Sequence, residues 1–275
     1  MKYRHSFHAG NFADVHKHIT LLAVIAGLQR KDKGFLYLET HAGRGAYDLS
    51  ESPGSRASRT GLAHILAEPG ESAEIQAYGN AVRHWRELAH DRNAYPGSPV
   101  LAAGALRDQD RAILIEQQPP EAHALERALA HHGKVRVELG DGLRLMRAHL
   151  PPAERRGLVL IDPPYEESSR DFELARTTIG EILQRFATAV IMLWYPIKDA
   201  RDTQLWRKRL GARLQQPLLV SELWVHPCDS RVALNGSGLL IIHPPYQLAQ
   251  RMRIWLPQLV GMLDAAQTGG CLVEE

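Results

Sequence analysis

The run Asp162-Pro163-Pro164-Tyr165 combines a carboxylate, two rigid prolines and an aromatic ring directly after an apolar stretch. A carboxylate oxygen of Asp162 and the carbonyl of Pro163 could each accept a hydrogen bond from a planar NH₂ group. Those two bonds would pull the nitrogen towards tetrahedral geometry and free its lone pair to attack an electrophilic methyl group. The prolines fix the backbone, and Tyr165 offers a flat face for an unstacked base. The predicted chemistry is methylation of an exocyclic amine, with Asp162, Pro163 and Tyr165 as catalytic residues.

This four-residue motif does not by itself select one amine. The same acceptor geometry serves an adenine in RNA, an adenine in DNA or the side-chain amide of a protein glutamine, and a plain strand-ending turn has the same composition. A second Pro-Pro turn, at residues 243–246, begins with His243, whose neutral imidazole offers one acceptor lone pair and no charge. We expect the second turn to be structural and Asp162 to carry the chemistry.

A glycine turn and a series of acidic residues stand where an open α/β sheet binds its cofactor. Glu39 ends an apolar run and is followed by a Gly-Arg-Gly turn that begins at Gly43, where the backbone can bend sharply and approach a ligand closely. The third glycine of a dinucleotide fingerprint is missing, which disfavours a nicotinamide dehydrogenase. Glu116 could bind both ribose hydroxyls of an adenosyl group, and Asp141 could accept from its adenine amine. Singly, each acid could be a helix cap; their order predicts the successive loops of an S-adenosyl-L-methionine site.

Short continuous apolar runs that alternate with helical patterns must position these residues. Such runs are typical of strands buried in a parallel sheet, and they occupy residues 35–38, 112–115, 158–161, 189–194, 218–225 and 239–242, with a shorter, interrupted pattern at 135–139. Apolar residues at helical spacing precede the first run, at 13–29, and lie between later ones, at 122–130 and 172–185. The last two apolar runs are joined by a polar loop without room for a helix, which predicts an antiparallel hairpin at one edge. We therefore predict a Rossmann-like α/β fold with a mostly parallel sheet.

The spacing of two acids predicts an insertion in this fold. The first and second acidic strand ends of a compact fold of this type lie on the order of 20 residues apart, whereas Glu39 and Glu116 lie 77 apart. The excess falls at residues 48–95, which contain helical patches at 60–67 and 75–89 and no strong strand pattern. We expect residues 1–47 and 96–275 to form the main domain, with residues 48–95 as a helical subdomain that walls the substrate cleft.

Composition sets broader limits. A chain of 275 residues with 44% apolar residues suits one large α/β domain with an insertion, and a net charge of +2 permits a polyanionic partner without requiring one. Two cysteines provide neither a disulfide framework nor a zinc site, which fits a reducing compartment. The polar start predicts no signal peptide, and the short apolar runs predict no membrane span. These features together predict a cytoplasmic protein.

Histidines and basic residues are the remaining candidates for binding. His16 and His18 lie two apart, so on a helix they point to different faces and cannot share one ion; we predict no metal site. Scattered basic side chains could contact phosphates, although such charges usually solvate a surface. They are Arg4, Lys17, Arg201, Arg207, Lys208, Arg251 and Arg253.

Over essentially its whole length, the chain resembles the RlmJ family of bacterial 23S ribosomal RNA adenine methyltransferases. The most specific stretch is residues 3–18, where Tyr-Arg-His-Ser-Phe-His-Ala-Gly-Asn is followed by Ala13-Asp14-Val15 and Lys17-His18. Further stretches that look like the family lie at 35–38, 40–43, 95–99, 155–158, 161–166 and 193–196. The turn at 243–246 departs from the family pattern, which is closer to Asn-Pro-Pro-Trp, and this leaves the role of that turn open.

The resemblance implies an S-adenosyl-L-methionine-dependent enzyme of class I fold that methylates the 6-amino group of one adenine in 23S rRNA, naked or in an early assembly particle. Beside the turn at Gly43, it implies cofactor contacts at His18, His41, Ser98, Glu116, Asp141, Gly142 and Asp162. It also implies that Tyr3, Lys17 and Tyr165 face the substrate. The alternative in a different class is a non-catalytic RNA-binding assembly factor, against which the intact glycine turn and acids argue.

Overall fold

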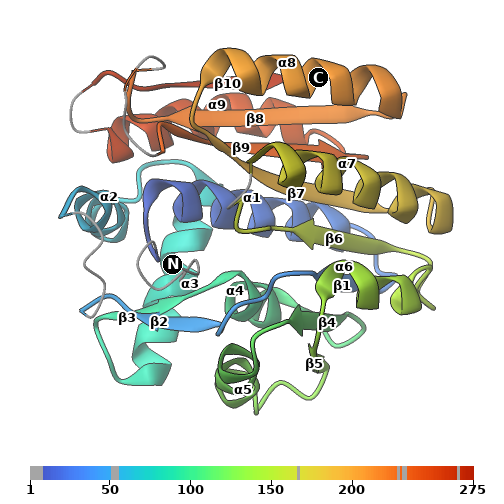
Figure 1. Cartoon of the computed structure of the whole chain (residues 1–275). Helices are drawn as coiled ribbons and strands as arrows, with labels where there is room; N and C mark the ends of the chain where they lie inside the picture. Colours follow the sequence, from blue (N-terminus) through green and yellow to red (C-terminus); the bar gives the residue numbers. More distant parts are fainter. Residues whose placement is uncertain (1–8, 51–55, 166–167, 228–229, 231–233, 265–266) are drawn as a thin grey trace.

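An eight-stranded sheet runs through the part of the chain that this computed structural model describes, residues 9–50, 56–165, 168–227, 230, 234–264 and 267–275. Its strand order is β10-β8-β9-β7-β6-β1-β4-β5 (Figure 1). Five neighbouring strands pair in parallel, as their continuous apolar sequences predict. They are β5 (Val135–Leu139), β4 (Arg111–Glu116), β1 (Leu36–Glu39), β6 (Gly157–Ile161) and β7 (Val190–Ile197). The parallel α/β prediction is confirmed.

The other three strands are antiparallel. β9 (Gly236–Ile242) lies between β7 and β8 (Leu218–Trp224) and runs opposite to both, which confirms the predicted hairpin. The hairpin is not the outermost element, however, because β10 (Gly270–Glu274) pairs antiparallel with β8 and forms the edge of the sheet. Residues 270–274 therefore form the outermost strand on this side.

Helices cover both faces of the sheet and bury two apolar cores. Alternate residues of β1 divide between them: Tyr37 lies in one cluster, and Leu36 and Leu38 lie in the other. The Tyr37 face is covered by α1 (Phe12–Gln29), α4 (Ser98–Ala105), α5 (Pro119–Ala128) and α9 (Leu248–Leu263). The opposite face is covered by α6 (Gly142–Leu145), the short 3₁₀ helix η2 (Met146–His149), α7 (Ser168–Arg185) and α8 (Ala200–Leu214).

The region between β1 and α4 contains two helices, α2 (Arg56–Ala67) and α3 (Ala73–Ala89). Two short strands that the sequence pattern did not indicate, β2 (Ala46–Asp48) and β3 (Ala94–Pro96), pair antiparallel on either side of them. Both helices pack on α1 and α9, and the buried Ile65 and Tyr78 belong to the same apolar cluster as α1. The two helices thus share their core with the main sheet.

Neither a membrane span nor a metal cluster is found in the described part of the chain. No helix there is long and apolar enough to cross a membrane. No group of three or more histidine, cysteine, aspartate or glutamate side chains there is arranged to hold an ion.

Candidate active site

The loops that follow the parallel strands converge at one edge of the sheet. After β1, the backbone N–H of Thr40 donates to the carbonyl of Leu160 in β6 (3.1 Å), and that of Ala42 donates to the carbonyl of Ile115 in β4 (3.0 Å). These bonds hold the glycine turn between the ends of both neighbouring strands. This carboxyl edge is where an open parallel sheet binds its ligands.

Asp162, the first residue after β6, binds a lysine from α1. The Nζ of Lys17 lies 2.5 Å from Oδ2 of Asp162 and 3.1 Å from Oδ1 of Asp14, and only 5% of the Lys17 side chain is exposed. The backbone N–H of Gly10 donates to the other oxygen of Asp14 (3.0 Å). The ammonium of Lys17 thus bridges the two carboxylates. Because a carboxylate has about four acceptor positions, Asp162 keeps capacity for a substrate amine.

The ring of Tyr165 is buried in this conformation. The residue has a positive φ of 50° and is 2% exposed, and its hydroxyl donates to the carbonyl of Trp194 (2.9 Å). Its ring centroid lies 5.0 Å from Phe172 and 5.8 Å from Trp194. Pro163 is buried and Pro164 is exposed. Here Tyr165 anchors the turn, so stacking of a base on its ring stays a prediction, one that needs the ring to leave this position.

Glu39 ends β1 inside the protein, below the turn. It is fully buried and accepts hydrogen bonds from the hydroxyls of Ser98 (2.5 Å) and Tyr37 (2.8 Å). Burial raises the pKa of Glu39 to about 8, although both hydrogen bonds and the charge of Lys17 oppose that rise. Ser98, a predicted cofactor contact, therefore supports this buried acid.

Glu116 and the glycine turn are directly bonded. One carboxylate oxygen of Glu116 accepts from the N–H of Gly43 (2.8 Å), and the other accepts from the N–H of Gln118 (2.8 Å). The φ of Gly43 is +63°, and a Cβ there would lie 2.7 Å from the hydroxyl of Tyr47. The turn therefore requires glycine at this position.

Asp141 and Gly142 bring the loop after β5 against the loop after β1. Asp141 is exposed and caps α6 by accepting from the N–H groups of Leu143 and Arg144. A Cβ at Gly142 would lie 1.8 Å from the carbonyl oxygen of Thr40. The absence of a side chain at Gly142 is thus what allows the two loops to touch.

The two predicted cofactor histidines occupy different depths. His18 is 1% exposed, and its Nδ1 lies 3.0 Å from the hydroxyl of Tyr95, which in turn contacts Tyr78 of α3. The Nδ1 of His41 lies 2.8 Å from Oγ1 of Thr40. Burial lowers the pKa of His41, and the charges of Asp162 and Asp141 oppose that shift. His41 therefore lies near both carboxylates, whereas Tyr3 falls outside the described residues.

Two residues near Asp162 were not predicted from the sequence. Asp14 is one of them, and its i, i+3 spacing to Lys17 was the available signal. The other is Trp194, whose ring centroid lies 5.9 Å from Nζ of Lys17 and whose indole N–H donates to Ser237 (3.0 Å). Ser237 also contacts the fully buried His16 (3.1 Å), the pKa of which burial lowers to about 3. Nothing in the sequence around Trp194 indicated this network.

The second Pro-Pro turn lies at the amino ends of the parallel strands, opposite the carboxyl ends where Asp162 lies. His243 follows β9, and because β9 is antiparallel to β7, its end lies beside the start of β7. The Nδ1 of His243 lies 2.9 Å from the carbonyl oxygen of Ala189, and its Nε2 lies 2.8 Å from the side-chain oxygen of Gln216. These contacts describe a turn that closes the sheet, far from Asp162.

The sheet order, the glycine turn after β1 and the acidic residues at or just after the ends of β4, β5 and β6 define a Rossmann-like methyltransferase of class I. The sequence model of the family described as "Ribosomal RNA large subunit methyltransferase D, RlmJ" matches residues 32–274. The chain belongs to this family.

Individual relatives agree over nearly full length. The chain is 40% identical to "Ribosomal RNA large subunit methyltransferase J" of Escherichia coli K12, over 99% of this chain and 98% of the relative. It is 37% identical to the protein of the same name from Haemophilus influenzae, over 100% and 98%. A crystal structure of a Legionella pneumophila protein, 32% identical, superposes with a TM-score of 0.86 over 98% of both chains.

Proposed function

We propose that this protein transfers a methyl group from S-adenosyl-L-methionine to the 6-amino group of one adenine in 23S ribosomal RNA. The observation that carries the proposal is Asp162, paired with Lys17 at 2.5 Å where the loops after the parallel strands meet. The names of the relatives, ribosomal RNA large subunit methyltransferase J, support RNA as the substrate class.

The residues at the carboxyl edge fit this cofactor. The turn at Gly43 has no side chain to obstruct a ligand, and Glu116 holds that turn through one oxygen while keeping acceptor positions for ribose hydroxyls. The exposed Asp141, beside Gly142, suits an adenine amine. We place His41 in the wall of the same pocket, with Ser98 and His18 supporting it from below. When bound, S-adenosyl-L-methionine supplies an electrophilic methyl group on sulfur.

The chain's own residues would prepare the amine for attack. The carboxylate of Asp162 and the carbonyl of Pro163 would each accept a hydrogen bond from one N–H of the amine, which localises the nitrogen lone pair. The ion pair with Lys17 fixes the direction of Asp162, so the acceptor needs no reorganisation during the reaction. Most of the rate then comes from positioning rather than from a covalent intermediate. Tyr165 would support the base once its ring leaves Trp194, and Tyr3 would face the substrate from the N-terminal segment.

We further propose that residues 48–95 are a subdomain inserted between residues 1–47 and 96–275, and that they wall the RNA cleft. Deleting them would uncover the shared core around Ile65 and Tyr78, so substitutions at exposed positions of α2 and α3 are the better test. The substrate would be naked 23S rRNA or an early assembly particle in the cytoplasm.

Transfer of a tritiated methyl group to defined substrates tests the proposal. We expect incorporation into transcribed 23S rRNA, and mass spectrometry of rRNA fragments should locate it on the N6 of one adenine that is unmethylated in a strain lacking the protein. Preference for DNA of the same sequence, or for a glutamine peptide, would overturn the substrate assignment. Tight RNA binding without any transfer would instead indicate an assembly factor.

A further inference from the structure

A groove of about 740 Å³ lies between α7, the end of β7 and α8. Figure 1 shows these two helices, in yellow and orange, beside each other on one side of the sheet. The half-buried rings of Phe172 and Trp206 line the groove, with centroids 4.5 Å apart. The groove therefore has one aromatic ring from each helix in its wall.

The groove begins at the carboxyl ends of the parallel strands, where Asp162 also lies. Helix α7 follows β6 and α8 follows β7, so both helices start at the carboxyl ends of their strands. The Phe172 ring lies 5.0 Å from the ring of Tyr165. Asp171, next to Phe172, is close enough to Tyr165 to contribute to its raised pKa, after burial and Asp162. An aromatic path thus leads from the Asp-Pro-Pro-Tyr turn into the groove.

The acidic residues that line the groove lie near its active-site end and stabilise the helices there. Glu173 pairs with Arg176 (2.8 Å), and Asp199 caps α8 by accepting from the N–H of Asp202 (2.9 Å). Asp202 itself lies in the first turn of α8, where a carboxylate stabilises the start of a helix. These carboxylates thus stabilise local structure at the active-site end.

Beyond its first turn, α8 is basic. Arg209 and Arg213 are exposed and line the groove, and Lys208 is exposed beside them. Arg207, also on α8, is instead buried and pairs with Glu274 (3.0 Å) and Glu222. Two exposed arginines of α8 thus line the groove beyond its first turn.

We propose that the α7–α8 groove binds the single-stranded RNA that flanks the target adenine, with phosphates on Arg209 and Arg213 and a base against Trp206. This inference rests on the proposed function, since it concerns the substrate of the same site. An amine can be methylated only after its base leaves the helical stack, so unpaired nucleotides must lie next to the site. Basic grooves with aromatic side chains are how proteins hold single strands without reading their sequence.

Binding and methyl transfer should be measured separately for two RNAs, one with about ten nucleotides on each side of the adenine and one with about two. The variants are Arg209→Glu/Arg213→Glu and Trp206→Leu, and the matched control is Arg127→Glu, an exposed arginine on α5 at the other edge of the sheet. For the double variant we expect the Kd and KM of the long RNA to rise roughly tenfold or more, with kcat and cofactor affinity unchanged. The short RNA should bind all variants equally. The slope of log Kd against log salt should fall by about 0.7 for each phosphate that the variant no longer binds.

Equal affinity of the double variant and the control for the long RNA would overturn the groove assignment. The same is true if the double variant fails only on a ribosomal particle, because the groove would then contact a ribosomal protein. If thermal melting shows that Trp206→Leu unfolds, the double arginine variant still tests the groove, because both arginines lie on the surface. Absence of methyl transfer by the wild-type protein would contradict the proposed function, while its RNA affinity would still test the groove.

Discussion

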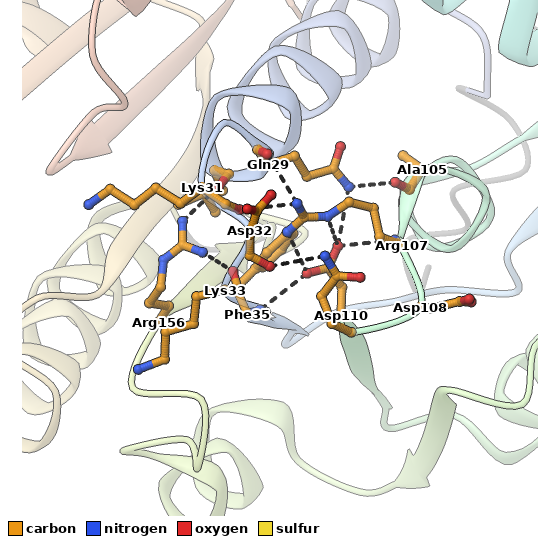
Figure 2. Close-up of polar contacts among 12 residues, drawn as sticks. Gln29, Lys31, Asp32, Lys33, Phe35, Ala105, Arg107, Asp108, Asp110 and Arg156 are labelled. Atoms are coloured by element: carbon orange, nitrogen blue, oxygen red, sulfur yellow. Dashed lines mark hydrogen bonds and ion pairs between the residues drawn. The ribbon is translucent and has the colours of Figure 1, made fainter.

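Each end of the parallel sheet holds a carboxylate bound to a cation, and the two are built differently. At the amino ends, Asp110 is 1% exposed and accepts five hydrogen bonds from Arg107, Gln29 and the backbone of Phe35 (Figure 2). At the carboxyl ends, Asp162 shares Lys17 with Asp14. The first carboxylate is saturated by the protein, and the second keeps acceptor capacity for a ligand.

The arginines around Asp110 also bind backbone carbonyls. Arg107 also donates to the carbonyls of Gln29 (3.1 Å) and Lys31 (3.0 Å), and Arg156 donates to those of Leu28 and Lys33. These bonds join the end of α1 to the starts of β1, β4 and β6 (Figure 2). A charge cluster in which each carboxylate oxygen is already bound maintains the fold, whereas a partly used one can bind substrate.

Removing the charge of Asp162 is the strongest test of this comparison. We expect Asp162→Asn to lower kcat by roughly 10²–10³-fold, because the amine loses a fixed ionised acceptor, and to change cofactor affinity little. Single-turnover methyl transfer and calorimetric cofactor binding measure the two effects. A kcat within tenfold of wild type, or a parallel loss of cofactor affinity, would contradict the assigned role.

Glu39 should make the stability of the carboxyl end fall as pH rises from about 4.5 to 8. Its pKa is raised from 4.5 to about 8 in the folded protein, so the folded state binds the proton more tightly than the unfolded state. Its contribution is complete below about pH 4.5 and decreases as pH rises towards 8, by up to a few kcal/mol. Relative to Glu39→Gln, the wild type should therefore lose stability over this range in denaturant titrations. A constant difference between the two proteins would contradict the raised pKa.

Asp110 should show the opposite pH dependence. Burial alone would raise the pKa of Asp110, but the hydrogen bonds and charge of Arg107, with a bond from Gln29, lower it below its usual value. Its stabilisation is therefore present above pH 4 and decreases as pH falls further. We expect Asp110→Asn to lower the free energy of unfolding at pH 7 by about 2 kcal/mol, with kcat unchanged below the melting temperature. A selective loss of kcat would remove the distinction between the two ends.

A smaller effect is expected from Gly142→Ala. The new Cβ would meet the Thr40 carbonyl at 1.8 Å, so the loops after β1 and β5 must separate. We expect cofactor affinity to fall roughly tenfold, equivalent to about 1.4 kcal/mol. Gly133→Ala is the control, since a Cβ there meets nothing within 4 Å. Equal cofactor affinities in the two variants would show that close approach of the loops is not needed.

Much of the fold could be predicted because parallel strands are buried on both faces. Short continuous apolar runs such as residues 158–161 are typical of such strands, and all four residues of β1 are buried. β10 was not predicted, because it is not buried on both faces and has no comparable apolar run. It is a half-exposed edge strand, and its pairing with β8 depends on a fold that local sequence does not encode.

The sequence predicted which acids lie at the strand ends, but not which side chains those acids contact. Acids at strand ends must gather at one edge of a parallel sheet, so Glu116, Asp141 and Asp162 could be grouped from sequence alone. Which side chains they bind depends on packing between distant elements: Lys17 of α1 pairs with Asp162, which lies 145 residues later in the chain. The burial of Tyr165 against Trp194 is likewise a tertiary result.

The position of β10 also bears on how the protein can be handled. Its strand lies at the edge of the sheet farthest from β5, with four strands between it and β1, and Glu275 follows it directly. A fluorophore on β10 would therefore lie away from the glycine turn but beside α8, because Glu274 of β10 pairs with Arg207 of α8 (3.0 Å). Such a label would suit the detection of RNA in the α7–α8 groove rather than of cofactor at Gly43.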